Sequence, residues 1–400
     1  MRTWLSTPGV VCALGAGINT VAQHAFAADT SGMQPEMGWV SDHALTLGRF
    51  SGALPPIPEY LPAHYRSRNN QLLLAAAQQI EPQLRVAIAQ YGALRIAVVL
   101  GTSTSGVNEN TPAFETLATQ GEWPLDYDYR RQELSSPASF LASWLGLSGI
   151  AYTISTACTS SARALLSAQH LLSMNLCDAV ICGGADTLCR LTINGFAAIE
   201  AIDPVLCRPF SVTRRGINIG EASVIFLMTR EKHDPESISL LGGGASSDAY
   251  HMSSPHPDGT GAIEAMQAAL QTAKVSANDI GWVNLHGTGT AHNDAMESLA
   301  MQRIFPRGVP CTSTKPLTGH TLGTASALEA ALAWATLLPT RNPEGRLIPH
   351  LWDNQVDPTL PVLSLTHAKH TYPRGKPRVA MSNSFAFGGS NVSLIFSNET

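Results

Sequence analysis

Several features are scarce or missing in this 400-residue chain, and each absence argues against a class of protein. No apolar run reaches the ~20 residues of a transmembrane helix without Gly, Pro or a polar interruption, so we expect no membrane span. Charged residues make up only 14% of the chain, and the formal net charge is −5. Neither value favours bulk attraction to nucleic acid or to an anionic membrane. The 44% hydrophobic content and the lack of a low-complexity linker indicate a compact globular protein.

The seven cysteines lack paired Cys-x-x-Cys spacing, which argues against a zinc site. Buried, reduced thiols fit better, and they favour a cytoplasmic location. Ala25-Phe26-Ala27 resembles a signal-peptide cleavage site, but Pro8, Gly9 and Gly15 interrupt the apolar stretch before it. We therefore predict that residues 3–17 form a first strand and turn.

Short runs rich in Val, Ile and Leu alternate with alanine-rich helical patterns. This alternation predicts α/β layers with buried strands. The runs are residues 95–100, 179–182, 224–228, 282–285 and 392–396.

A weak internal repeat divides the chain. Leu-Gly-Thr-Ser-Thr at 100–104 resembles His-Gly-Thr-Gly-Thr at 286–290, and each segment follows an apolar run. We therefore predict two similar halves, residues 1–236 and 237–400, which meet at a turn near residues 232–238.

Cys158 lies in Thr-Ala-Cys-Thr-Ser, directly before residues with helical apolar spacing. A thiol at a helix N-terminus meets the positive end of the dipole and free N–H groups, so we expect a lowered pKa and a nucleophilic sulfur. The alternative is an inert buried thiol. His320 begins the equivalent helix of the second half, so a pseudo-twofold arrangement would bring it beside Cys158.

Two further motifs surround the histidines. His286 follows an apolar run, where side chains of an α/β fold face the usual ligand crevice. Thr288 and Thr290, in the loop after it, carry hydroxyls suited to the amides of an extended substrate arm. A buried pair of Lys315 and Glu329 could orient His320 and fix its tautomer. Either histidine could instead be a structural residue.

Residues 383–391 form a glycine-rich aromatic turn without lysine, which argues against a phosphate-binding P-loop. Free N–H groups around Phe387, Gly388 and Gly389 suit an oxyanion hole. The rings of Phe385 and Phe387 suit a gate. An ordinary turn into the last strand is the alternative.

Together these motifs resemble the elongating β-ketoacyl-acyl carrier protein synthases, which are thiolase-fold condensing enzymes. The resemblance runs from about residue 9 to residue 396. It implies an acyltransferase with a five-layered αβαβα fold built from two similar halves, and it implies a dimer. The first half would carry Cys158, and the second half would carry both histidines and the glycine-rich gate.

The resemblance also implies roles. Cys158 would take an acyl chain from acyl carrier protein as a thioester, and its N–H and that of Phe387 would hold the oxyanion. His286 and His320 would assist decarboxylation of malonyl-carrier protein. Lys315 and Glu329 would form the supporting pair, and Phe387 would be the gatekeeper. Thr288 and Thr290 would contact the substrate arm, and Thr104 would shape the acyl pocket. We infer no metal, redox cofactor or nucleotide, because the substrates arrive on the phosphopantetheine of the carrier.

Residues 101–106 replace a more glycine-rich stretch of the fatty acid pattern, and residues 158–161 are closer to polyketide-like synthases. They indicate a specialised type II pathway for a polyene or polyketide-like lipid. The chain could then be a homodimer or a heterodimer with a chain-length-factor-like paralogue. Carrier protein is acidic, so a basic docking patch is expected. The candidates are Arg66 with Arg68, and Arg208 with Arg214 and Arg215.

Two rival functions are weighed against this one. A thiolase acting on coenzyme A thioesters would need a second catalytic cysteine near the C-terminus, and no cysteine follows Cys311. A catalytically silent chain-length-factor-like subunit would usually have lost the nucleophile, whereas this chain keeps Cys158.

Overall fold

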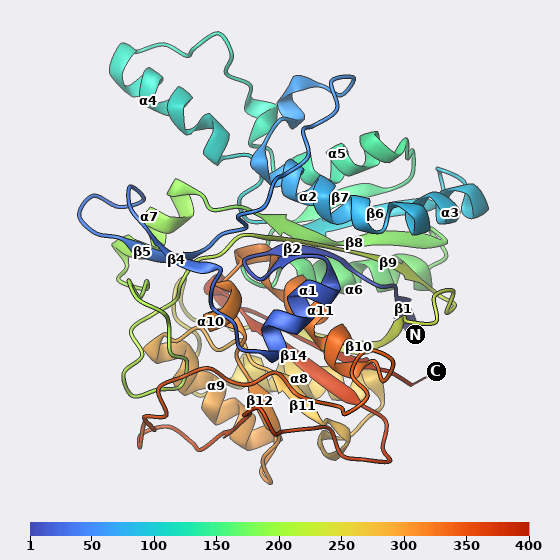
Figure 1. Ribbon diagram of the computed structural model, residues 1–400, viewed down its shortest axis with the longest axis vertical. Coiled ribbons are helices and arrows are strands. Elements are labelled where there is room, and N and C mark those ends of the chain that lie inside the picture. The colour runs from blue at the N-terminus through green and yellow to red at the C-terminus, as the bar shows by residue number, and fades with distance from the viewer. Residues whose placement is uncertain (400) are drawn as a thin grey trace.

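The computed structural model describes residues 1–399, and its main sheet consists of two groups of strands with helices between them (Figure 1). The first group contains β7 (Ala151–Ile154), β6 (Ile96–Gly101), β8 (Ala179–Asp186), β9 (Ala222–Thr229) and β2 (Gly9–Cys12), with β3 (Gly15–Ala16) paired to β2. The second contains β13 (Ser364–Leu365), β12 (Pro310–Thr312), β11 (Trp282–Asn284), β14 (Val379–Phe385), β15 (Ser390–Ser397) and β10 (Ile238–Ser247).

The N-terminal segment joins these groups. Strand β1 (Thr3–Leu5) pairs with β9 on one side and with β10 on the other. Residues 3–16 therefore form strands and a turn, as predicted from the sequence. Strands β4 (Met33–Glu36) and β5 (Leu45–Gly48) form a separate two-stranded sheet.

Both groups share one pairing pattern. Strand β6 pairs in parallel with β7 and β8, whereas β9 runs antiparallel to β8. Strand β11 likewise pairs in parallel with β12 and β14, and β15 runs antiparallel to β14. The pattern agrees with the two similar halves inferred from the repeat. The boundary between residues 236 and 237 stays a prediction.

Helices cover the strands and fill the space between the two groups (Figure 1). They are α1 (Ile18–Phe26), α2 (Arg68–Gln79), α3 (Glu81–Tyr91), α4 (Thr111–Gln120), α5 (Ser136–Leu145), α6 (Ser160–Ser173), α7 (Arg190–Ala198), α8 (Thr260–Ala273), α9 (Ala291–Ile304), α10 (Lys315–Thr318) and α11 (Ala325–Leu337).

Alternate residues of each strand face different helix layers, because side chains of a strand point to opposite faces. In β6, Leu100 packs in a cluster with α2, α3 and α5, whereas Val99 packs with α6 and α11. In β14, Ala380 belongs to the cluster of α11, and Met381 packs with α8 and α9. The result is the order of layers helix, sheet, helix, sheet, helix.

Helix α11 is buried on every side, from Ala325 to Leu337. A helix that is apolar all round belongs in the interior, and its alanines let neighbouring elements approach closely. Helix α6 packs against it in the same cluster. The starts of α6 and α11 are therefore held at the centre of the molecule.

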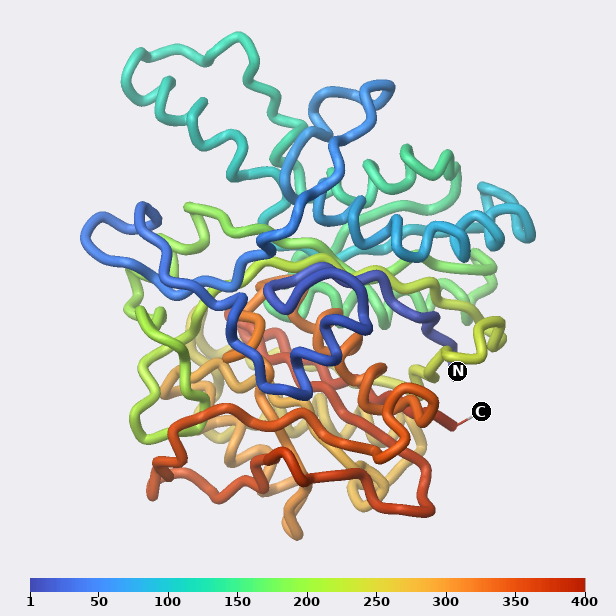
Figure 2. Tube along the Cα trace, viewed as in Figure 1, coloured from blue at the N-terminus to red at the C-terminus, as the bar shows by residue number. Residues whose placement is uncertain are grey.

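Helix α4 projects away from these layers, at the top left of Figures 1 and 2. The loop after it carries Trp123, whose partly exposed ring stacks on Tyr127 with centroids 4.0 Å apart. Within residues 1–399, none of the helices combines the length and apolar character needed to span a bilayer.

Close packing at Gly101 lets α6 begin against β6. A Cβ atom placed there would lie 2.3 Å from the Ser161 nitrogen. We expect Gly101→Ala to lower the free energy of unfolding by ~1–3 kcal/mol, because the backbone must shift to relieve the overlap. Thermal and urea unfolding would measure this change.

Gly195→Ala is the matched control, since a Cβ there meets no atom within 4 Å and the residue lies inside α7. Its stability should be unchanged or slightly higher, because alanine favours helix. Equal unfolding midpoints for the two variants would contradict the packing argument.

Candidate active site

Cys158 stands in a tight turn between β7 and α6. Ala157 before it has φ 51°, in the left-handed region that costs an L-residue energy. Two hydrogen bonds hold the turn: the Ser160 hydroxyl donates to the Ala157 carbonyl (2.6 Å), and the Thr156 N–H donates to the Ser160 hydroxyl (2.9 Å). This fixed turn presents the sulfur to a cavity of about 400 Å³.

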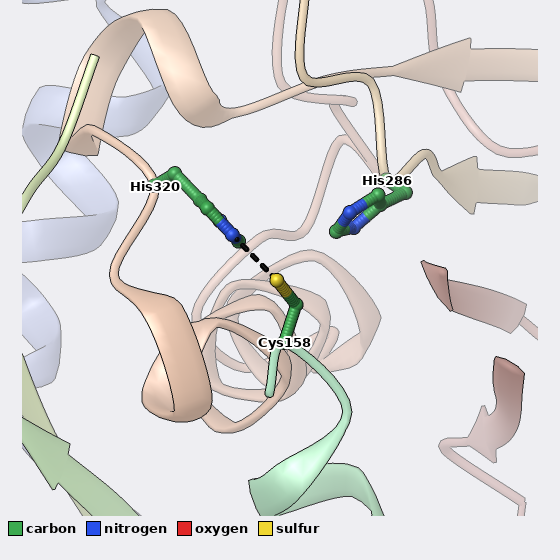
Figure 3. A group of neighbouring side chains, drawn as sticks. All are labelled: Cys158, His286 and His320. Atoms are coloured by element: carbon green, nitrogen blue, oxygen red, sulfur yellow. Dashed lines mark hydrogen bonds between the residues drawn. The ribbon is translucent and has the colours of Figure 1, made fainter. Parts of the chain in front are cut away.

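The structure brings the three predicted side chains together in that cavity (Figure 3). The Cys158 Sγ lies 2.9 Å from the His320 Nε2. One ring nitrogen of His286, one of His320 and the sulfur all lie within 4.8 Å of one another. The two imidazole rings are nearly perpendicular, with centroids 5.5 Å apart. Residues far apart in sequence thus share one pocket.

A buried carboxylate on α9 holds the loop that begins at His286. The Glu297 side chain accepts the His286 N–H (2.8 Å) and the Gly287 N–H (2.7 Å). Burial raises the Glu297 pKa to about 7, although both N–H groups lower it. No role is predicted for Glu297 from the sequence. Its one sequence signal is a carboxylate in the helix that follows the histidine loop.

The backbone of His320 is held by the first half of the chain. Its N–H donates to the Asn218 carbonyl (2.6 Å), and its carbonyl accepts the Gly220 N–H (3.0 Å). Buried Asp186 secures the next turn, since it accepts the Thr324 N–H (2.9 Å). These contacts were also not foreseen, because they join segments about a hundred residues apart.

Lys315 and Glu329 form a buried ion pair, with Nζ and Oε1 2.7 Å apart. The pair makes no hydrogen bond to either imidazole, and the Nδ1 atoms of His286 and His320 have no partner within residues 1–399. The predicted fixing of a tautomer by this pair is therefore not observed. Its effect on the rings is electrostatic.

Both histidines are held neutral. Burial is the main cause that lowers the pKa of His286 and of His320 well below the usual value, and the Lys315 charge lowers each further. Neutral rings can donate or accept a hydrogen bond, and with Nδ1 unpaired either tautomer is open to each ring.

The predicted lowering of the Cys158 pKa is wrong. Burial raises the pKa of this thiol to about 12, while the Lys315 charge and the Phe387 N–H act in the opposite direction. A helix end contributes typically ~0.3–1 kcal/mol, less than the ~1.4 kcal/mol of one pKa unit, so it cannot offset this burial. The free thiol is therefore protonated at neutral pH.

The glycine-rich turn lies beside the sulfur. The Phe387 N–H hydrogen-bonds to Cys158, and Gly388 and Gly389 adopt φ values of 82° and 79°. Phe385 and Phe387 line the cavity. The Phe387 ring also meets Phe196 of α7, with centroids 5.4 Å apart. No sequence pattern predicted that Phe196 would contact Phe387.

The remaining predicted substrate contacts divide. Thr288 and Thr290 line the cavity, and their hydroxyls are 2.9 Å apart. Thr104 does not line it. Its side chain is buried, and its hydroxyl donates to Asp186 (2.9 Å) and accepts the Thr187 N–H (3.1 Å). The expected part of Thr104 in an acyl pocket is not supported by this position, because the buried carboxylate draws the hydroxyl inward.

Three of the five predicted docking arginines are engaged internally. Arg68 binds buried Glu221, Arg208 binds Asp353 (3.4 Å), and Arg214 is 9% exposed and binds Asp357 (2.6 Å). These ion pairs favour a structural role for them. Arg66 and Arg215 are exposed, and Arg215 lines the active-site cavity.

The same triad is spaced closely enough to hold a metal ion. Metal-bound histidines normally donate their other ring N–H to a carboxylate or carbonyl, and the Nδ1 atoms here lack such partners within residues 1–399. The donor set therefore fits thiol chemistry better than a metal centre. The expectation of no metal stays a prediction.

Comparison with known proteins agrees with this site. The N-terminal domain model of β-ketoacyl synthases matches residues 63–233, and the C-terminal domain model matches residues 238–341. Nodulation protein E of Rhizobium meliloti is 31% identical over 339 residues, covering 82% of each chain. The chloroplastic 3-oxoacyl-[acyl-carrier-protein] synthase II of Arabidopsis thaliana is 31% identical, covering 77% of this chain and 58% of that protein.

Solved structures show the same likeness over the whole chain. The ketosynthase ApeO, in complex with its chain length factor ApeC from Xenorhabdus doucetiae, is 47% identical with a TM-score of 0.91, covering 99% of this chain and 97% of that one. A β-ketoacyl synthase from Burkholderia phymatum is 28% identical with a TM-score of 0.83, covering 100% of both. These matches confirm the predicted thiolase-like fold. The chain belongs to the β-ketoacyl synthase family.

Proposed function

We propose that this protein is a β-ketoacyl-acyl carrier protein synthase that condenses an acyl group held on Cys158 with malonyl-carrier protein. The observation that carries the proposal is the cavity in which one thiol and two neutral imidazoles face each other. The relatives named as 3-oxoacyl-[acyl-carrier-protein] synthases support the same chemistry.

Acyl transfer needs a proton acceptor, because the Cys158 thiol is protonated. The His320 Nε2, 2.9 Å from the sulfur, takes that proton as the sulfur attacks the thioester carbonyl of the carrier. The N–H groups of Cys158 and Phe387 stabilise the oxyanion. The carbon–sulfur bond to the carrier then breaks, and the departing thiolate receives the proton from His320.

Condensation uses the same rings as donors. Loss of carbon dioxide from malonyl-carrier protein leaves an electron pair on the α-carbon, and hydrogen bonds from His286 and His320 to the thioester oxygen stabilise the enolate. The α-carbon then attacks the acyl carbonyl on Cys158. The new carbon–carbon bond replaces the carbon–sulfur bond, and the departing Cys158 thiolate takes up one proton from solvent. The unfixed tautomers let His320 accept a proton in one half-reaction and donate in the other.

The pathway and partner follow from the strongest likeness reported above. ApeO was solved with a chain length factor, and it is 47% identical to this chain. This likeness supports a type II pathway and a heterodimer with a chain-length-factor-like paralogue over a homodimer. We further propose a cytoplasmic enzyme that uses acyl carrier protein and needs no cofactor beyond the phosphopantetheine of the carrier. The retained triad argues against a catalytically silent subunit.

Removing the nucleophile tests the reaction. Cys158→Ala should form no acyl adduct by mass spectrometry after mixing with acyl-carrier protein, because the sulfur that would take the acyl group is gone. It should still decarboxylate malonyl-carrier protein. Adding His286→Ala or His320→Ala should slow that decarboxylation about 10²–10³-fold, the usual effect of one lost oxyanion donor.

Cys177→Ala is the control for these variants, since this thiol is buried and does not line the cavity. It should keep both activities. Undiminished decarboxylation after loss of either histidine would show that the proposed roles are wrong.

The protonated state of Cys158 predicts a pH profile. Alkylation by iodoacetamide requires thiolate, so its rate should rise about tenfold per pH unit from pH 7 to 10 without levelling. Cys158→Ala should lose this labelling, because the other six cysteines do not line the active-site cavity. A plateau below pH 8 would mean that the thiol is instead activated in the free enzyme.

A further inference from the structure

One exposed arginine at the active-site cavity is free of internal partners. Arg215 lines the cavity, and within residues 1–399 it has no hydrogen bond or ion pair of its side chain. Its neighbour Arg214, by contrast, is bound to Asp357. Burial raises the pKa of Asp203, which the charges of Arg208 and Arg215 oppose, but no ion pair forms between Asp203 and Arg215. Such a cation is available to a ligand.

The position of Arg215 is fixed by its neighbours. Gly216 has φ 149°, and a Cβ at Gly289 would lie 2.7 Å from the Gly216 carbonyl oxygen. The segment therefore packs directly on the loop that carries Thr288 and Thr290, both of which line the cavity. Arg215 thus stands beside the two predicted contacts of the substrate arm.

The start of α9 adds positive potential to the same wall. Ala291, His292 and Asn293, in its first turn, line the cavity. The N-cap Thr290 makes no side-chain hydrogen bond to this turn. Free N–H groups and the helix dipole favour an anion at such a place. Together with Arg215 they form a site for one anionic group.

A carboxylate lines the same cavity as this cation. Glu200 lines the same cavity in a left-handed conformation, with φ 55°. Its segment runs beside that of Arg215, because the Ile217 N–H donates to the Ala201 carbonyl (2.8 Å). Because both side chains line one cavity, the Glu200 carboxylate repels an anion held there.

We propose that Arg215 binds the phosphate of the phosphopantetheine arm and that Glu200 opposes this binding. The inference rests on the proposed function, because it takes the arm as the substrate carrier. Arg215 is then a specificity-determining residue for phosphate-bearing thioesters, in contrast to Arg68, Arg208 and Arg214, whose charges are already paired.

The proposed phosphate contact is tested by measuring KM for three malonyl thioesters, with enzyme that has been acylated beforehand on Cys158. Malonyl-carrier protein and free malonyl-phosphopantetheine both carry the phosphate, whereas malonyl-pantetheine lacks it. Arg215→Ala should raise KM about tenfold for the first two and leave the third unchanged, because a charged hydrogen bond to phosphate is lost. Glu200→Gln should lower KM for the first two only.

Arg307→Ala is the matched control, as another exposed arginine outside the active-site cavity, and it should change none of the three values. An effect of Arg215→Ala on carrier protein alone would assign Arg215 to the protein surface of the carrier and overturn the proposal. An equal change for all three thioesters, or none, would also overturn it. Turnover of malonyl-pantetheine by the wild type and by Arg215→Ala separates this outcome from a failure of the synthase activity itself.

Discussion

Two hydrogen bonds between the starts of α6 and α11 hold the reacting groups together. The Ser326 hydroxyl donates to the Cys158 carbonyl (3.1 Å), and the Ser161 hydroxyl accepts the Ala327 N–H (2.9 Å). Each helix thus satisfies a polar group of the other, at a depth where water does not reach. Because β6 ends in Gly101, α6 can start this close to the sheet. The distance between sulfur and imidazole follows from these contacts.

One buried ion pair adds its charges to the electrostatics of the site. Lys315 and Glu329 lie out of water, and each needs the other, because breaking such a pair typically costs ~3–5 kcal/mol. Their placement near the imidazoles keeps a positive charge next to rings that must stay neutral. The pair therefore adds to the effect of burial on the two imidazoles without touching the reacting atoms.

The sequence allowed the triad, the two halves and the layered fold to be predicted, because each reactive residue sits in a short motif after an apolar run. What it did not reveal depends on contacts between distant segments. Glu297 and Phe196 gained their roles only when α9 and α7 were placed beside the cavity. The pKa of Cys158 was predicted in the wrong direction, because a helix start is visible in sequence and the depth of burial is not. Thr104 lies outside the cavity because its hydroxyl binds buried Asp186, a contact that the sequence does not show.

The raised pKa of Cys158 has a consequence for survival of the enzyme under oxidative stress. Peroxide oxidises thiolates to sulfenic acid, and it reacts poorly with protonated thiols. The other six cysteines are buried, and burial raises their pKa values as well. We therefore expect peroxide to oxidise the thiols of the free enzyme slowly, even though one of them is the nucleophile.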